Sequence, residues 1–275
     1  MFVRRKKCMQ NEIKKKIVLI TGASRGIGKA IAETLNASGY KVIGTSRNVE
    51  TIPKEDKITG VRYLQLDLTI NDSIEILIQD VGTVDVLINN AGISQVGPIE
   101  EVPMKKIREL FEPNLFGLIY LTQGLLPQMR IRKEGLIINI TSMTSRSPVP
   151  FSTFYGITKA GVEAFSKGLQ NEVERFGIKT VVISPFEMNT TIPQEIILKE
   201  NSPYYDITMK AKKIRDKNLA NAPDPRLVGK LVLKILKSKN PKFFYPVGNN
   251  GFIKNFLIKH ASRNFIKKQT IKRYQ

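Results

Sequence analysis

Tyr155 and Lys159 lie four residues apart in the segment YGITK, and Ser142 precedes Tyr155 by 13 residues. If this segment is helical, the tyrosine and the lysine share one face of the helix. A phenol has a pKa of about 10, and lowering it to ~7 requires about 4 kcal/mol of stabilisation of the charged form. A nearby ammonium group supplies part of that stabilisation. Tyr155 is therefore a candidate general acid and base, supported by Lys159, with Ser142 donating a hydrogen bond to a substrate oxygen.

The alternative is a structural role, with Tyr155 in the core and Lys159 on the surface. A tyrosine and a lysine at this spacing are expected about once by chance in a chain of this composition, so the pair has no meaning alone. Ser142 favours the catalytic interpretation, because it ends a predicted strand and parallel α/β sheets bind their ligands at the carboxyl ends of strands.

Three glycines follow the first apolar stretch of the chain, residues 16–21, with the spacing GxxxGxG. Gly22 permits a tight turn, Gly26 lets the backbone approach a pyrophosphate, and Gly28 lets the following helix pack on the sheet. The start of that helix offers free N–H groups to a phosphate. The pattern therefore indicates a dinucleotide-binding loop, although an ordinary turn between a strand and a helix can also be rich in glycine.

The second predicted strand, residues 41–46, is followed by Arg47 where a site selective for NAD carries an acidic residue. No acid follows until Glu50, and Arg25 in the glycine-rich loop adds a second guanidinium. Guanidinium groups match phosphate geometry, so both arginines can bind the 2′-phosphate of NADP. The sequence therefore predicts NADP(H) in preference to NAD(H). The alternative is that both are ordinary surface arginines.

Polar residues also end the third and fourth predicted strands, at Asp67 and in the segment NNAG, residues 89–92. Asp67 can accept a hydrogen bond from an adenine amino group, and the two amides can form a polar wall beside adenine and ribose. Each segment alone is equally compatible with a turn. Their placement at successive strand ends favours a shared ligand.

Short apolar segments alternate with longer amphipathic ones along the chain. Strands that are apolar throughout, separated by helices, are typical of a parallel sheet covered on both faces. We therefore predict an α/β fold with a doubly wound parallel sheet of the Rossmann type, in one domain over residues 16–250. The predicted strands are residues 16–21, 41–46, 61–66, 84–89, 136–140, 179–184 and 242–247. The predicted helices are 26–38, 73–81, 105–129 with an interruption at Pro113, 154–176 and 225–238, with helical pieces between prolines in 187–224.

The net charge of +20 is concentrated at the two ends of the 275-residue chain. Residues 1–16 carry +6, and residues 251–275 carry +7 with no acidic residue. We predict a basic N-terminal extension, residues 1–15, and a basic amphipathic tail, residues 251–275. Solvated ends are the simplest interpretation, contact with an anionic membrane is the second, and nucleic acid is not an expected partner.

Within the tail, apolar residues at positions 252, 253, 256 and 257 are interleaved with lysines. This spacing indicates an amphipathic helix, which can lie on an anionic membrane surface. A lid over a substrate, or a contact between subunits, produces the same pattern, so these interpretations stay open.

Cys8 and His260 are the only residues of their types, which excludes an internal disulfide and a metal site built from cysteines or several histidines. The first apolar stretch is shorter than the about 7–15 residues of a signal peptide. The longest uncharged stretch, residues 113–129, is shorter than the about 20 residues of a membrane span. We therefore expect a cytoplasmic protein without a metal cofactor, with or without peripheral membrane contact.

Together these segments resemble the short-chain dehydrogenase/reductase (SDR) family, over residues 16–190. The matching motifs are TGASRGIG (21–28), Asp67, NNAG (89–92), Asn114, Ser142 and YGITK (155–159). The resemblance implies that Ser142 orients the substrate, Tyr155 is the acid and base, Lys159 supports it, and Asn114 positions a proton relay through water. It also implies cofactor contacts from Gly22, Ser24, Arg25, Gly26, Ile27, Gly28, Arg47, Asp67, Leu68, Asn90, Ala91, Gly92, Tyr155, Lys159, Pro185 and Thr190.

Residues 111–130, 148–179 and 241–248 resemble the 17β-hydroxysteroid-dehydrogenase-like branch, which acts on apolar alcohols and ketones such as steroids, retinoids and other lipids. We therefore expect an NADP(H)-dependent oxidoreductase for a hydrophobic substrate. The alternative is a catalytically silent NADP-binding protein with a regulatory or structural role. The family also implies a homo-oligomer, a dimer or a tetramer, in which helices 105–129 and 154–176 pair between subunits.

Two positions depart from the family pattern. Phe186 follows Pro185 where the family has glycine, so we expect it to reshape the nicotinamide pocket or to narrow the substrate entrance. Pro113 precedes Asn114, and a helix break there fits the kink that exposes the asparagine backbone in this family. Thr190 stands where the family's threonine binds the carboxamide.

Overall fold

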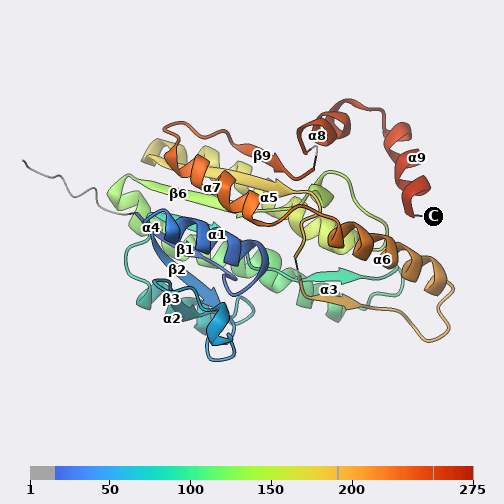
Figure 1. Ribbon diagram of the computed structural model, residues 1–275, viewed down its shortest axis with the longest axis horizontal. Helices are drawn as coiled ribbons and strands as arrows, with labels where there is room; N and C mark the ends of the chain where they lie inside the picture. The colour runs from blue at the N-terminus through green and yellow to red at the C-terminus, as the bar shows by residue number, and fades with distance from the viewer. Residues whose placement is uncertain (1–15, 191, 250, 275) are drawn as a thin grey trace, which may run out of the picture.

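Seven parallel strands form the main sheet of the computed structural model, which describes residues 16–190, 192–249 and 251–274 (Figure 1). The sheet has the order β3-β2-β1-β4-β6-β7-β9 and confirms the predicted doubly wound α/β fold. The predicted extension, residues 1–15, lies outside the described residues, as do the side chains of Phe252, Lys254 and Lys259. The strands are β1 (Ile17–Ile20), β2 (Lys41–Ser46), β3 (Arg62–Gln65), β4 (Val86–Asn89), β6 (Gly135–Ile140), β7 (Ile178–Pro185) and β9 (Phe244–Val247).

Successive residues of the central strands pack against opposite layers of helices. Val18 and Ile20 of β1 face one layer and Leu19 faces the other. The first layer contains α1 (Gly26–Ala37) and α7 (Arg226–Lys237), which lie side by side in Figure 1. The second contains α2 (Asn71–Asp80), α4 (Gly117–Arg132) and α5 (Thr153–Val173). Burial on both faces explains why the central strands β1, β4 and β6 are mostly apolar, whereas the edge strand β3 has exposed polar residues.

The order of the strands reverses at β1 and β4, which are neighbours in the sheet although β2 and β3 separate them along the chain. The loops that leave these two strands diverge and leave a crevice at the carboxyl ends. The glycine-rich loop follows β1, the NNAG segment ends β4, and Ser142 follows β6. The topology therefore brings three of the predicted motifs to one edge of the sheet.

The predicted helix 105–129 is divided by a π-helical turn. Helix α3 (Met104–Phe111) leads into this turn, Glu112–Phe116, and α4 follows it directly. Pro113 has no N–H to donate to the preceding turn, which explains why the regular hydrogen-bond pattern is interrupted here. The predicted interruption at Pro113 is confirmed. The chain does not leave the helix there: it forms one wider, π-helical turn and continues directly into α4.

The region 187–224 is more regular than the sequence predicts. Strand β8 (Gln194–Ile196) pairs with β5 (Ser94–Val96) in a second, two-stranded parallel sheet, and α6 (Tyr205–Ala220) is one continuous helix. Three-residue strands are too short to show a periodic pattern. Short 3-10 turns occur at Lys54–Asp56, Met143–Ser145 and Glu174–Phe176.

The tail forms two helices, α8 (Gly251–His260) and α9 (Arg263–Tyr274), and α9 contacts α6. Figure 1 shows both helices at the same end of the molecule as the carboxyl ends of the strands. In the ranges that the structure describes, no helix is both long and apolar enough to cross a bilayer.

Candidate active site

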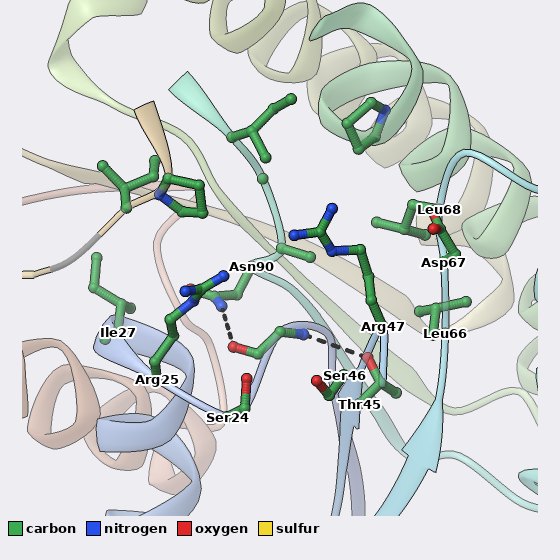
Figure 2. Close-up of a pocket in the computed structure, with 18 of the residues that line it drawn as sticks. Ser24, Arg25, Ile27, Thr45, Ser46, Arg47, Leu66, Asp67, Leu68 and Asn90 are labelled. Carbon is green, nitrogen blue, oxygen red and sulfur yellow. Dashed lines mark hydrogen bonds between the residues drawn. The ribbon is translucent and has the colours of Figure 1, made fainter. Parts of the chain in front are cut away.

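A cleft of about 920 Å³ runs along the carboxyl ends of the strands, and Figure 2 shows the residues around it. Two of the predicted cofactor residues do not line it. Gly28 lies behind the loop, where a Cβ atom would approach the Gly22 carbonyl oxygen to 2.1 Å, and Pro185 lines a second cleft instead. The predicted cofactor residues that do line the cleft are Gly22, Ser24, Arg25, Gly26, Ile27, Arg47, Asp67, Leu68, Asn90, Ala91, Gly92, Tyr155, Lys159 and Thr190.

The loop between β1 and α1 depends on glycine. Gly22 and Gly26 have φ angles of 68° and 55°, in the left-handed region that other residues rarely adopt. A Cβ atom on Gly22 would lie 3.1 Å from the Cα atom of Ala91, so the backbone passes close to the end of β4. Helix α1 begins after Arg25, which has no side-chain oxygen to cap the first N–H groups. Those groups are available to an anion at the start of the helix.

Asn90 supports this loop from behind. Its Nδ2 atom donates to the carbonyl oxygen of Thr21 at 2.9 Å and to that of Gly22 at 3.2 Å, and Figure 2 shows the second of these bonds. The Thr21 hydroxyl in turn accepts hydrogen bonds from the backbone N–H groups of Asn90 and Ala91. Of the two amides predicted to form a polar wall, only Asn90 lines the cleft, and its amide nitrogen fixes the loop that would hold a phosphate. The prediction is wrong for Asn89, which is buried and donates to Thr122 and Asn139 instead.

Asp67 shapes its own turn at the end of β3. Its Oδ1 atom accepts hydrogen bonds from the backbone N–H and the hydroxyl of Thr69, at 2.9 and 2.7 Å. Asp67 lines the cleft at the predicted adenine end, but one of its two oxygens already has two donors. Its predicted contact with an adenine amino group stays a prediction.

Arg25 and Arg47 reach into the cleft from the start of α1 and the end of β2 (Figure 2). Neither guanidinium pairs with a carboxylate of the described residues. Sequence reasoning missed two acids that line this cleft: Asp56 forms a 2.5 Å ion pair with Lys29, and Glu109 forms a 3.0 Å ion pair with Lys106. This end of the cleft therefore presents two unpaired guanidinium groups and a carboxylate that is already neutralised.

Tyr155 and Lys159 lie on α5, as predicted, and both are buried. The Nζ atom of Lys159 lies 5.8 Å from the centroid of the Tyr155 ring and donates to the carbonyl oxygen of Ile140 at 3.2 Å. Burial lowers the pKa of Lys159 to about 8. Burial also raises the pKa of Tyr155 above its usual value, while the charge of Arg215 and a hydrogen bond with Ser142 oppose that rise. Tyr155 is consequently protonated at neutral pH in the unliganded protein.

Ser142 follows β6 and stands directly before the 3-10 turn Met143–Ser145. Its hydroxyl oxygen accepts a hydrogen bond from the backbone N–H of Thr144 at 3.2 Å, which fixes the side chain. The same hydroxyl forms the hydrogen bond with Tyr155. Ser142 and Tyr155 both line the second cleft, so the structure brings together the two residues predicted to meet a substrate oxygen.

Asn114 is fully buried in the π-helical turn. Its side-chain amide accepts from the N–H of Ile93 and donates to the Ile93 carbonyl, both at 2.9 Å. The adjacent Gly92 leaves room at this point, because a Cβ atom there would lie 3.0 Å from Asn114 Oδ1 and 3.5 Å from Lys159 Nζ. Asn114 therefore lies beside the Lys159 ammonium, while its predicted relay through water stays a prediction.

The second cleft, of about 780 Å³, shares Tyr155 with the first. Its far wall is formed by the tail, through Leu257 and Ile258 of α8 and Phe265 and Ile266 of α9. Apolar residues also line the near wall: Ile27, Met143, Pro148, Val149, Pro185, Phe186, Met188, Ile192 and Leu219. The geometry therefore places an apolar compartment directly beside the candidate acid.

Phe186 lines this second cleft and also contacts the beginning of the tail. Its ring lies 3.6 Å from the position of a Cβ atom on Gly251, the first residue of α8. The larger side chain therefore lies in the wall of the second cleft, near the start of α8, and its predicted effect on a nicotinamide pocket or a substrate entrance stays a prediction. No local sequence pattern could predict this proximity, because Phe186 and Gly251 are far apart along the chain.

The protein-family model described as short chain dehydrogenase matches residues 16–201. The chain is 36% identical to a 3-ketodihydrosphingosine reductase of Bacteroides thetaiotaomicron, over 84% of this chain and 87% of that protein. It is 34% identical to the mouse dehydrogenase/reductase SDR family member 7B, over 68% of this chain and 62% of that protein.

Solved structures agree with these relatives. A short-chain dehydrogenase from Streptomyces avermitilis superposes with a TM-score of 0.81 at 31% identity, covering 95% of this chain and 96% of the other. A serine dehydrogenase complexed with NADP+ superposes with a TM-score of 0.72 at 26% identity, covering 85% and 94% of the two chains. The protein therefore belongs to the short-chain dehydrogenase/reductase family of oxidoreductases, as its motifs predicted.

Proposed function

We propose that the protein is an NADP(H)-dependent oxidoreductase that interconverts a carbonyl and a secondary alcohol on a hydrophobic substrate. The observation that carries this proposal is the position of Tyr155, which lines both the dinucleotide cleft and the apolar cleft. A proton donor at this junction can reach a substrate whose reacting carbon faces a bound cofactor.

The residues divide the chemistry between them. A nicotinamide dinucleotide, when bound, supplies or accepts the hydride. In reduction, Tyr155 donates its phenolic proton to the carbonyl oxygen, and Ser142 donates a hydrogen bond to the same oxygen as negative charge develops there. The Lys159 ammonium stabilises the phenolate that Tyr155 leaves behind. In oxidation the same groups act in reverse, and Tyr155 takes the proton from the alcohol.

The preference for NADP(H) rests on charge. Arg25 and Arg47 have no carboxylate partner among the described residues, and Asp56 is neutralised by Lys29. Two guanidinium groups match a 2′-phosphate, whereas the 2′-hydroxyl of NAD favours an unpaired acid. Relatives solved with NADP bound, including the serine dehydrogenase, support the same preference.

The substrate class follows from the apolar lining of the second cleft. We propose a steroid-, retinoid- or lipid-like ketone or alcohol, and the similarity to a 3-ketodihydrosphingosine reductase supports a lipid ketone. The competing function is a silent NADP-binding protein with a regulatory or structural role. Oxidation of NADPH by the full-length protein, followed with ketosteroids, retinal, long-chain ketones and quinones, separates the two. Turnover of one class supports the enzyme, whereas tight NADPH binding without turnover of any of them supports the silent protein.

We also propose that the tail contacts an anionic membrane surface. Ile253 and Phe256 of α8 are 62% and 61% exposed, and residues 251–275 carry seven basic residues and no acid. Exposed apolar side chains among basic ones favour the boundary of an anionic bilayer. Sedimentation with vesicles containing phosphatidylserine at low salt tests this proposal. Phe256→Ser is expected to weaken binding, Lys239→Gln outside the tail is the control, and failure of the unmodified protein to bind would contradict the proposal.

Self-association is a further proposal from the family. Phe116 beside α4 and Ile157 on α5 are 50% and 46% exposed, which provides apolar surface for a dimer or tetramer through these helices. Light scattering of the full chain measures the mass directly. Ile157→Glu is expected to give a monomer, and an unmodified protein that is monomeric throughout would contradict the proposal.

A further inference from the structure

Arg215 of α6 is a cation in the wall of the apolar cleft. It lines that cleft together with Ser142 and Tyr155, although it is far from both in the sequence. Its Nη2 atom donates to the Ser94 hydroxyl at 3.2 Å, and its Nη1 atom donates to the Ser152 hydroxyl at 3.5 Å. Both serines are buried, and Ser152 directly precedes the helix that carries Tyr155. The guanidinium is therefore held in place relative to the candidate acid.

The hydrogen bonds of Arg215 leave its charge uncompensated, because both partners are neutral hydroxyls. Arg146, the other partly buried arginine among the side chains that the structure describes, pairs with Glu163 at 2.5 Å. Even the more exposed Arg132 lies 3.8 Å from the carboxylate of Asp85. No ion pair joins Arg215 to a carboxylate among the described residues.

A fixed guanidinium in an apolar compartment favours an anionic ligand. The charge is only partly hydrated there, so an oxygen anion that reaches it gains more than it would at an open surface. The planar fork of N–H groups matches a carboxylate. Leu219, Leu257 and Phe265 line the same cleft and provide an apolar surface for the rest of the ligand.

We propose that Arg215 binds a carboxylate on the substrate, so that the enzyme acts on an apolar keto acid or hydroxy acid. This inference rests on the proposed function, because it places the carboxylate on the molecule that meets Tyr155. The second cleft then has two recognition elements: a cation on α6 beside the catalytic helix, and an apolar wall formed by the tail.

Binding of decanoate and decanamide to the full-length protein loaded with NADP+ tests the proposal by isothermal titration calorimetry at fixed ionic strength. The two ligands share a chain length and differ in charge. We expect decanoate to bind about tenfold or more tightly than decanamide, as a charge-assisted hydrogen bond requires. Arg215→Gln is expected to abolish this difference and to leave decanamide binding unchanged, while Arg215→Lys retains part of it. Lys272→Gln, which removes another cation lining the cleft, is the matched control and is expected to keep the preference.

Equal affinity of the unmodified protein for the two ligands would overturn the proposal. If Arg215→Gln loses affinity for decanoate and decanamide alike, the proposal is also overturned, because Arg215 would then have a structural role in the cleft. Calorimetry measures binding and needs no turnover, so it tests the anion site separately from the proposed function. If the protein prefers decanoate but reduces no ketone, the anion site is supported and the proposed function is contradicted.

Discussion

The side-chain amide of Asn114 forms hydrogen bonds with both backbone polar groups of Ile93, each at 2.9 Å. Asn114 lies in the π-helical turn, and Ile93 follows the NNAG segment that ends β4. One side chain therefore joins the irregular point of the helix to the wall of the dinucleotide cleft. Gly92, between these groups and Lys159, has no side chain to hold them apart.

Asn114→Ala is expected to destabilise the protein by about 2–4 kcal/mol, because it removes both hydrogen bonds from the partly buried N–H and carbonyl of Ile93. The free energy of unfolding in urea measures this loss. Asn36→Ala is the control, since the amide of Asn36 donates one solvent-exposed hydrogen bond, to the Thr59 carbonyl. A loss equal to that of the control would show that the Ile93 contacts contribute little.

The rate of carbonyl reduction is expected to be steady below pH 8 and to fall above it. Burial lowers the pKa of Lys159 to about 8, so its ammonium loses its proton as the pH rises through this value. Loss of that charge removes the stabilisation of the phenolate that Tyr155 forms on donating its proton. The pH profile of kcat/KM measures this titration. Lys167→Gln, on the exposed side of the same helix, is expected to keep the profile, and a rate that stays constant well above pH 8 would refute the role of Lys159.

Arg47→Gln is expected to weaken NADPH binding by about 10- to 100-fold while changing NADH binding little, because a charged hydrogen bond to the 2′-phosphate is lost. Titration of each cofactor by its fluorescence gives the two dissociation constants. Arg62→Gln on the neighbouring strand β3 is the control, since Arg62 does not line the cleft. Equal losses for the two cofactors in Arg47→Gln would show that Arg47 does not distinguish them.

Phe186→Gly is expected to loosen the tail, because it removes the ring that lies against the first residue of α8. Trypsin then cuts more readily in residues 251–275, which contain seven basic residues. Mass spectrometry of a digestion time course measures the change. Phe186→Leu keeps an apolar contact and serves as the control. Unchanged cleavage in Phe186→Gly would mean that other contacts hold α8.

The sheet could be predicted from the sequence because strands that are buried on both faces consist mostly of apolar residues. Residues 136–140, for example, are apolar except for the buried Asn139, since helices cover both faces of β6. The motifs of the dinucleotide cleft were also predictable, because their glycines and polar residues occur at strand ends. Topology then brings those strand ends together, so short local patterns were sufficient.

Contacts between distant segments could not be predicted in the same way. Arg215 is separated from Ser94 by 121 positions, and no local pattern marks either residue as part of a site. The tail gave a clear amphipathic pattern, but that pattern does not identify which surface its apolar face covers. Asn90 and Asp67 were correctly placed at strand ends, whereas the hydrogen bonds that tie them to nearby loop residues depend on loop geometry.

The central claim is that Tyr155 transfers the proton while other groups hold the cofactor. Tyr155→Phe removes the hydroxyl and keeps the ring, so NADPH affinity is expected to change little. Turnover is expected to fall by about 100-fold or more, the usual contribution of a general acid. Tyr120→Phe, which removes a surface hydroxyl bonded to Glu75, is expected to leave both properties unchanged. The decisive measurement is kcat of Tyr155→Phe with NADPH and a ketone that the unmodified enzyme reduces: loss of turnover with NADPH still bound is the predicted result, and undiminished turnover would contradict the account.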